Sequence, residues 1–333
     1  MTLRAASLIA LLPVLALPIA AQAQTTASVQ PPSPAQTISI PAGTIATWAK
    51  QKPDQLVTFQ SKLSNDSKDK VEGWIWKPAT ATASAKVPLV IVAHGHSGSG
   101  TYASPSTQFQ TLAKQMIDLG VGVMLVNSFS SYRNDYVLNV AKYPADFTIV
   151  PGLNDDRTKR PPEASDHKVR PYDVVGAAEY VRAGNLPWVD ADKLVGVGYS
   201  HGGTAFLGAA LSKHPVNIDN PQGGGRLFKK LFISYPGCGM DSLNNYKGSA
   251  SVVPAIIGIG SADASVSPAY CTSRQAESVS VANLNPSLYA FEYWLYANGV
   301  HTWESKTDAV NKAIHEDWRK KIGDYVTTLK AAP

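Results

Sequence analysis

The sequence lacks three features that would each indicate a particular class of protein. No block of lysine and arginine is long enough to indicate a nucleic-acid partner, although the net charge is mildly basic at +5. After the first residues, no further apolar stretch resembles a membrane span. Cysteine is scarce, with only Cys238 and Cys271 in 333 residues. We therefore expect no nucleic-acid partner, no membrane span and at most one disulfide.

The first residues have the features of an export signal. Met1–Arg4 carries one positive charge, Leu8–Ala20 is a short apolar run, and Ala21-Gln22-Ala23 has the small-x-small pattern that a signal peptidase cleaves. We expect residues 1–23 to be removed and the mature protein to be periplasmic or secreted, with a retained amphipathic anchor as the alternative. Residues 24–53 are rich in Pro, Ser, Thr, Ala and Gln, which predicts a poorly ordered lead-in.

The expected export would place the two cysteines in an oxidising compartment. In an oxidising compartment, two thiols most simply form one disulfide, here between Cys238 and Cys271. Two buried free thiols are the alternative.

Residues 54–331 predict a single large α/β domain. Hydrophobic residues make up 44% of the chain, enough for a substantial core. Uninterrupted apolar runs, typical of strands covered on both faces, alternate with helical segments, and this predicts a mostly parallel sheet with helices on both faces. Strands are expected at Leu56–Gln60, Val71–Trp76, Val87–Ala93, Val121–Val126, Leu194–Tyr199, Leu231–Tyr235, Val253–Ile259 and Leu288–Trp294, and helices near Ser106–Leu119, Tyr172–Ala183, His201–Lys213 and Lys306–Leu329.

Residues 138–170 depart from this alternation. The segment is long, Pro-rich and charged, with six Lys or Arg against five Asp or Glu. It is either a surface excursion or a cap over a pocket at the carboxyl ends of the strands.

A glycine-flanked serine is the clearest functional signal. Gly198-Tyr199-Ser200-His201-Gly202 matches the G-x-S-x-G pattern of a nucleophile elbow, in which a serine occupies a strained turn from a strand into a helix. An apolar run precedes the pattern and a helical segment follows it, as the elbow requires. We expect Ser200 to be a nucleophile, the alternative being a tight turn with an inert serine.

A serine nucleophile needs donors for the oxyanion that develops on the substrate. Gly-rich His94–Gly100 directly follows the expected strand Val87–Ala93 and can direct a backbone N–H into the site. The amides of His96 and His201 are therefore the expected oxyanion hole. The His96 imidazole is a further candidate for the pocket lining.

The serine also needs a base and an acid to orient that base. Asp263 follows the expected strand Val253–Ile259, and His301 follows the strand expected to end near Trp294. The order Ser200, Asp263, His301 is the serine, acid, histidine order of α/β-hydrolases. Asp241, after the preceding strand, is the competing acid.

The histidines also permit a metal hypothesis. His94, His96, His201 and His301 would gather near one edge of the sheet, and imidazoles bind Zn²⁺. No carboxylate or cysteine completes a recognisable ligand spacing with them. We therefore expect neither a metal nor a cofactor.

With these residues in place, the chain from about Leu56 to Leu329 resembles the dienelactone hydrolase-like branch of the α/β-hydrolase superfamily. Asn127-Ser128-Phe129, followed by Tyr132-Arg133, is similar to the D-S-F-x-x-R segment of that branch, with Asn127 in place of the acid. Arg170-Pro171-Tyr172-Asp173 is similar to its R-x-x-D segment.

The resemblance implies an α/β-hydrolase fold with Ser200 as nucleophile, Asp263 as acid and His301 as base. Cys238 and Cys271 resemble the paired cysteines of exported members. Dienelactone hydrolases themselves use a cysteine where this chain has Ser200, so ordinary ester hydrolysis is favoured over the dienelactone reaction.

The functional hypothesis is an exported serine hydrolase that cleaves a small or polymeric carboxylic ester through an acyl-enzyme. The first alternative is an amidase or peptidase with the same triad, acting on an acidic polymer such as poly(aspartic acid), a substrate of exported relatives. The second is a catalytically silent binding protein on the same scaffold, against which the intact triad argues. Phe129, Tyr132 and Trp303 are candidates for the substrate pocket wall, although we expect at least one of them to pack in the core instead.

Overall fold

The structure, a computed structural model, describes residues 36–38, 49–62, 70–129, 170–239, 243 and 246–332. The chain divides into two compact units, Met1–Pro31 and Pro32–Pro333, and the first lies wholly outside the described residues. The expected signal peptide, most of the expected lead-in and all but the last residue of the expected cap also lie outside them, as do Tyr132 and Asp241.

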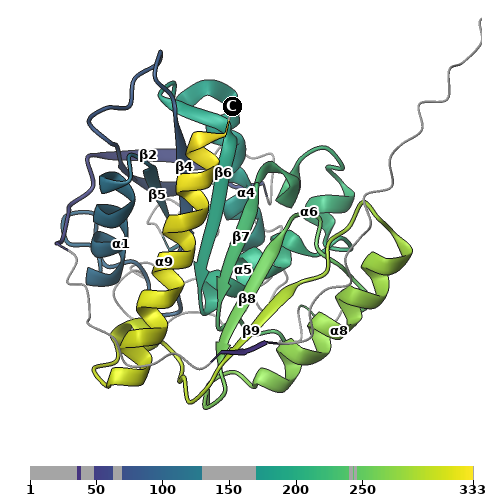
Figure 1. Cartoon of the computed structure of the whole chain (residues 1–333). Coiled ribbons are helices and arrows are strands. Elements are labelled where there is room, and N and C mark those ends of the chain that lie inside the picture. Colours follow the sequence, from purple (N-terminus) through teal and green to yellow (C-terminus); the bar gives the residue numbers. More distant parts are fainter. Residues whose placement is uncertain are drawn as a thin grey trace, which may run out of the picture. The chain divides into compact units, whose positions relative to one another are not determined.

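The described residues form one nine-stranded sheet with the order β1-β9-β8-β7-β6-β4-β5-β3-β2 (Figure 1). β2 and β3 are antiparallel, β3 is antiparallel to β5, and every other neighbouring pair is parallel. The strands are β1 (Gln36–Ile38), β2 (Gln55–Gln60), β3 (Lys70–Trp76), β4 (Val87–Ala93), β5 (Gly122–Asn127), β6 (Val189–Tyr199), β7 (Lys230–Ser234), β8 (Ala255–Gly260) and β9 (Glu292–Tyr296).

Helices cover both faces of this sheet, which accounts for the uninterrupted apolar runs in its strands. β4, β5 and β8 are buried at every residue. Figure 1 shows α1 and α9 on one face and α4 and α5 on the other. The helices are α1 (Thr107–Asp118), α4 (Arg170–Tyr180), η2 (Val181–Asn185), α5 (His201–Ala210), α6 (Pro215–Ile218), η3 (Gly224–Leu227), α8 (Pro268–Leu284), η4 (Trp303–Ser305) and α9 (Ala309–Ala331).

Several elements differ from the sequence-based expectation, and β6, for example, begins at Val189, five residues before the expected Leu194. α8 was not expected, because its buried residues include Arg274, Gln275 and Ser278 and therefore form no apolar stripe. β9 begins four residues later than expected, because the apolar run from Leu288 onward enters the sheet only at Glu292. β1 lies inside the expected lead-in and pairs with β9, so that segment has local structure at this point.

The carboxyl ends of the parallel strands meet at one edge of the sheet. Ala93 of β4 lies opposite Gly198 of β6, Tyr199 lies opposite Ser234 of β7, and Gly260 of β8 lies opposite Tyr296 of β9. The loops that carry the expected site residues therefore leave the sheet at the same edge, where open α/β sheets bind their ligands.

Candidate active site

Ser200 occupies a strained turn between β6 and α5. Its backbone has φ 53° and ψ −116°, in the left-handed half of conformational space that residues with a side chain rarely adopt. The Ser200 amide donates to the Ser234 carbonyl at 3.0 Å, and its own carbonyl accepts from the Thr204 amide at 2.8 Å. The surrounding backbone therefore holds the strained conformation from both sides.

The flanking glycines are required by close backbone approaches. A Cβ at Gly198 would collide with the carbonyl of Gly202, and a Cβ at Gly202 would collide with the carbonyl of Ala93 at the end of β4. The first helical turn of α5 therefore rests directly on the backbone of the sheet. This contact lets the chain reverse immediately after Ser200.

Ser200, His301 and Asp263 form one hydrogen-bonded chain. Ser200 Oγ lies 3.0 Å from His301 Nε2, and His301 Nδ1 lies 2.8 Å from Asp263 Oδ2. The other carboxylate oxygen of Asp263 accepts from the amides of Ser265 at 2.8 Å and Val266 at 3.0 Å. The Asp263 side chain is fully shielded, whereas the His301 side chain is 17% exposed.

These contacts favour one tautomer of His301. A carboxylate oxygen accepts, so Nδ1 carries the hydrogen and donates it to Asp263. Nε2 then presents a lone pair to the Ser200 hydroxyl. This arrangement can take a proton from Ser200 while the negative charge of Asp263 stabilises the imidazolium that forms.

The loop that carries His301 is anchored by the beginning of α9. The Val300 amide donates to Asn311 Oδ1 at 2.9 Å, and the Asn311 side-chain amide donates to the Asp308 carboxylate at 3.0 Å. Gly299 lies so close to Gly260 that a Cβ on Gly260 would collide with its backbone. The loops of the acid and the base therefore rest on each other. Asn311 was not singled out in the sequence, although Asp308 is an N-cap residue at the start of a long apolar stripe.

Tyr235 supports the His301 ring from the core. The ring centroids of Tyr235 and His301 are 4.6 Å apart, and the Tyr235 hydroxyl donates to the Glu304 carboxylate. Burial, followed by the negative charge of Glu304, raises the pKa of Tyr235 well above its ordinary value, so the phenol stays neutral and remains a donor. Neither Tyr235 nor Glu304 was singled out in the sequence, because nothing local marks a contact between β7 and η4.

The two expected oxyanion donors belong to segments that flank Ser200. His201 is the first residue of α5, and a Cβ on Gly95 would lie 3.4 Å from the Cβ of Ser200, so the turn after β4 contacts the nucleophile. The imidazoles of His96 and His201 face each other, with their Nδ1 atoms 3.1 Å apart. This contact ties the two segments together beside Ser200.

Phe129 lies in a cluster formed by the two segments that resemble the D-S-F-x-x-R and R-x-x-D motifs and by the turn after β4. Its half-buried ring is 4.6 Å from the His94 ring and 5.3 Å from the guanidinium of Arg170, measured to the ring centroids. Arg170 is 1% exposed and donates to the carbonyl of His94. The Asn127 and Arg170 segments therefore brace the turn after β4, which carries His96.

Trp303 is not a wall of an open pocket, in contrast to the expectation from the sequence. It is fully buried, with its ring 4.7 Å from Tyr235, 5.4 Å from Tyr296 and 6.1 Å from Trp318. The chain turns inward after His301, so the aromatic side chain completes the core below the loop.

A disulfide joins Cys238, beyond β7, to Cys271 in α8. Both cysteines are buried, with their Cα atoms 5.1 Å apart. In α8, one turn further along, Arg274 donates to the carbonyls of Leu243 at 3.1 Å and Tyr246 at 3.2 Å. The helix that follows the Asp263 loop is thus attached to the neighbouring loop by one covalent bond and one buried cation.

Replacing both cysteines by alanine is expected to lower the free energy of unfolding by about 3–4 kcal/mol, because a bond closing a loop of this length restricts the unfolded chain. The sequence separation of the pair is 33 residues. Guanidinium chloride unfolding measures this loss of stability. The reduced wild-type protein should unfold at about the same denaturant concentration as the double alanine variant. Two free thiols in a mass spectrum of the unreduced protein would contradict the bond.

In the described part of the chain, no group of three or more His, Cys, Asp or Glu side chains is arranged to hold a metal ion. Within the same residues, no helix is both long enough and apolar enough to cross a membrane.

No protein-family model matches the sequence, and no curated protein is similar to it at a significant level. Solved structures are similar in fold. Esterase 2 of Thermogutta terrifontis with propionate bound is 13% identical with a TM-score of 0.54, over 84% of this chain and 96% of that chain. A putative dipeptidyl aminopeptidase IV from Bacteroides ovatus is 15% identical with a TM-score of 0.53, over 84% of this chain and 36% of that chain.

A putative dienelactone hydrolase from Klebsiella pneumoniae is 17% identical with a TM-score of 0.51, over 82% of this chain and 99% of that chain. Its presence among these structures supports, at the level of the fold, the resemblance in the sequence. Identities this low establish architecture and not activity. The expectation of a mostly parallel sheet with helices on both faces is confirmed, and the chain has the α/β-hydrolase fold.

Proposed function

We propose that this protein is a serine hydrolase that cleaves a carboxylic ester through an acyl-enzyme intermediate. The observation that carries the proposal is the hydrogen-bonded chain of Ser200, His301 and Asp263, with Ser200 in a strained turn at the carboxyl edge of the sheet. Strain at a polar residue is costly and persists where the surrounding structure imposes it, often at catalytic positions.

Each residue has a defined step in this mechanism. Ser200 Oγ attacks the ester carbonyl while His301 Nε2 takes its proton, and Asp263 stabilises the imidazolium. The amides of His96 and His201 donate to the oxyanion of the tetrahedral intermediate. His301 then protonates the leaving alcohol, which departs and leaves an acyl group on Ser200. Water, activated by the same histidine, hydrolyses the acyl-enzyme and restores the serine.

The structural neighbours support an ester as the substrate. Esterase 2 of Thermogutta terrifontis is described with propionate and with butyrate bound, and as phosphorylated by paraoxon. Those are properties of that protein. They make short carboxylic esters the first substrates to test on this chain, and organophosphorus reagents the first covalent probes.

An amidase or peptidase that uses the same triad is the second candidate. The dipeptidyl aminopeptidase-like fold match favours it, although this chain spans only 36% of that protein. An acidic polymer such as poly(aspartic acid) remains the candidate amide substrate. The chemistry at Ser200 is the same for both candidates, so the leaving group alone distinguishes them.

A panel of matched esters and amides decides between these candidates. With the same acyl group, the nitrophenyl ester is expected to be hydrolysed with a higher kcat/KM than the anilide, and short acyl chains are the starting point. Poly(aspartic acid) serves as the polymeric amide. A higher kcat/KM on the anilide or the polymer would mean that the protein is an amidase and not an esterase. If neither class of substrate were hydrolysed, the hypothesis of a catalytically silent binding protein would replace both.

Export is also part of the proposal. Disulfides persist in oxidising compartments and are rare in the cytosol, so the Cys238–Cys271 bond supports a periplasmic or secreted protein.

A further inference from the structure

Tyr235 and Glu304 form a hydrogen-bonded pair next to the base of the active site. Tyr235 is fully buried, its ring centroid lies 4.6 Å from that of His301, and its hydroxyl donates to Glu304 Oε1. Trp303 packs on the same phenol ring, with the two ring centroids 4.7 Å apart. The phenol is therefore held at its ring by His301 and Trp303 and at its hydroxyl by Glu304.

Two strained residues bring this pair together. Tyr235 has a φ of 37° directly after β7, and Thr302 has a φ of 55° directly after His301. Bulky and β-branched residues rarely adopt this left-handed region, and such strain persists where the surrounding structure imposes it, often at functional sites. The Tyr235 amide donates to the carbonyl of Gly258 in β8 at 2.6 Å, so the sheet holds the first of the two turns. Both turns lead to the contact between Tyr235 and Glu304, which makes that contact a candidate functional feature.

Glu304 and His301 also interact through their charges. Burial raises the pKa of Glu304 above its ordinary value, whereas the hydrogen bond from Tyr235 and the positive charges of His301 and Lys306 act in the opposite direction. The interaction is mutual, so a Glu304 carboxylate that the imidazolium stabilises also stabilises the imidazolium. Asp263 is the first negative charge beside His301, at 2.8 Å from Nδ1, and Glu304 adds a second.

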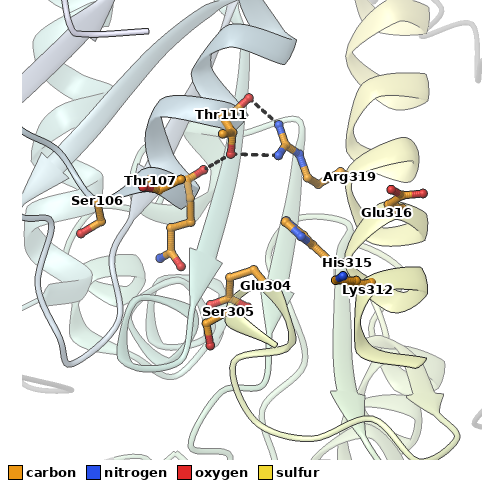
Figure 2. Close-up of a pocket in the computed structure, with 10 residues that line it drawn as sticks. Ser106, Thr107, Thr111, Glu304, Ser305, Lys312, His315, Glu316 and Arg319 are labelled. Carbon is orange, nitrogen blue, oxygen red and sulfur yellow. Dashed lines mark hydrogen bonds between the residues drawn. The ribbon is translucent and has the colours of Figure 1, made fainter. Parts of the chain in front are cut away.

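The titratable groups of α9 favour an ionised Glu304. Figure 2 shows Glu304 among the residues that line the cleft between α1 and α9, with Lys312 and His315 on the α9 side. Burial lowers the pKa of His315 to about 3 and that of Arg319 to about 10, so the imidazole is neutral and the guanidinium is a cation at neutral pH. Glu316 contributes a carboxylate to the same lining. On this side, two cations are therefore present with one competing carboxylate.

The groups on the sheet side of Glu304 are phenols. Burial raises the pKa of Tyr199 and of Tyr235 above the ordinary value, and the negative charge of Glu304 acts in the same direction on both. Both phenols are therefore neutral at neutral pH. Neither of them adds a negative charge beside Glu304.

We propose that Glu304 is a positioning residue of the active site, which fixes the Tyr235 ring against His301 and places a second negative charge near the imidazole. It acts through Tyr235 and through its charge, and its role requires no contact with the substrate. A second negative charge favours the imidazolium and so makes His301 a stronger base toward the Ser200 hydroxyl. The inference rests on the proposed function, in which His301 takes the proton of Ser200.

A pH titration of the His301 imidazole tests this inference. NMR spectra of the full chain follow the ring, whose signals are assigned by their absence from the His301→Gln variant. Glu304→Gln keeps an acceptor for the Tyr235 hydroxyl and removes the charge, so the midpoint of the titration should fall by about one pH unit. The acid limb of kcat/KM for the best ester should move to lower pH with it. The value of kcat should fall about threefold with KM little changed, because the rate follows only part of the lost basicity.

Glu316→Gln is the matched control, because it removes the same charge from the cleft but from α9 instead of the His301 loop. It should leave the midpoint and kcat unchanged. An unchanged midpoint in Glu304→Gln, or an equal shift in Glu316→Gln, would overturn the inference. If Glu304→Gln does not fold, Tyr235→Phe decides. It keeps the ring but removes the donor, which favours a neutral Glu304, so the midpoint should fall there too.

The titration does not depend on turnover. A lower midpoint in Glu304→Gln, in a protein that cleaves no ester, would support the role of Glu304 and count against ester cleavage alone. Loss of activity in Ser200→Ala together with an unchanged midpoint in Glu304→Gln would support the proposed function and overturn the role of Glu304.

Discussion

Replacing Ser200 by alanine is expected to lower kcat for the best ester by about 10⁶-fold, the loss seen when a nucleophile of this kind is removed. The same change should abolish covalent labelling by a fluorophosphonate probe. Both effects follow from one atom, because Ser200 Oγ is the group that faces His301 Nε2 at 3.0 Å. Steady-state kinetics and gel fluorescence of the labelled protein measure them.

Ser234→Ala is the matched control for this result. Ser234 is fully buried at the end of the neighbouring strand, and its hydroxyl has no partner among the described residues. Its backbone carbonyl, which accepts from the Ser200 amide, is retained in the variant. Activity and labelling should survive there. Labelling that persisted in Ser200→Ala would mean that another residue is the nucleophile.

The positions of Ser200, Asp263 and His301 could be predicted because parallel strands end at one edge of a sheet. Each residue follows an apolar run, and such runs are readable without knowledge of their neighbours. The sequence therefore predicted that three loops far apart along the chain lie close together in the fold. It did not indicate how each loop is anchored.

The anchoring depends on contacts that have no local pattern. Asn311 holds the His301 loop through the Val300 amide, and Arg274 holds the loop beyond β7 through backbone carbonyls. A polar side chain that is buried because distant carbonyls require it looks, in the sequence, like any exposed polar residue. The same fact explains why α8, with polar residues on its buried side, was missed.

The error at Trp303 has a different physical origin. A pocket wall and a core position both favour a large aromatic side chain, so the residue type does not separate them. The decision rests on which way the chain turns after His301. Thr302 has a φ of 55°, a left-handed conformation that neither the residue type nor the adjacent sequence indicates.

Replacing Asp263 by asparagine is expected to lower kcat by about 10⁴-fold while the protein stays folded. The reason is that the two carboxylate oxygens have different partners. Oδ1 accepts from the amides of Ser265 and Val266, so the carbonyl oxygen of an asparagine would take that end. Its NH₂ group would then face His301 Nδ1, where the carboxylate now accepts.

The consequence is the wrong tautomer of the base. An NH₂ group donates, so His301 Nδ1 would have to accept and its hydrogen would move to Nε2, which faces Ser200. The serine hydroxyl would then meet a donor instead of a lone pair, and the proton could not leave it. The loss should therefore fall on kcat more than on KM, and circular dichroism should show an unchanged fold. Asp241→Asn is the matched control, because Asp241 is the competing acid in the sequence. If its kcat fell further than that of Asp263→Asn, the acid that orients His301 would follow β7 and not β8.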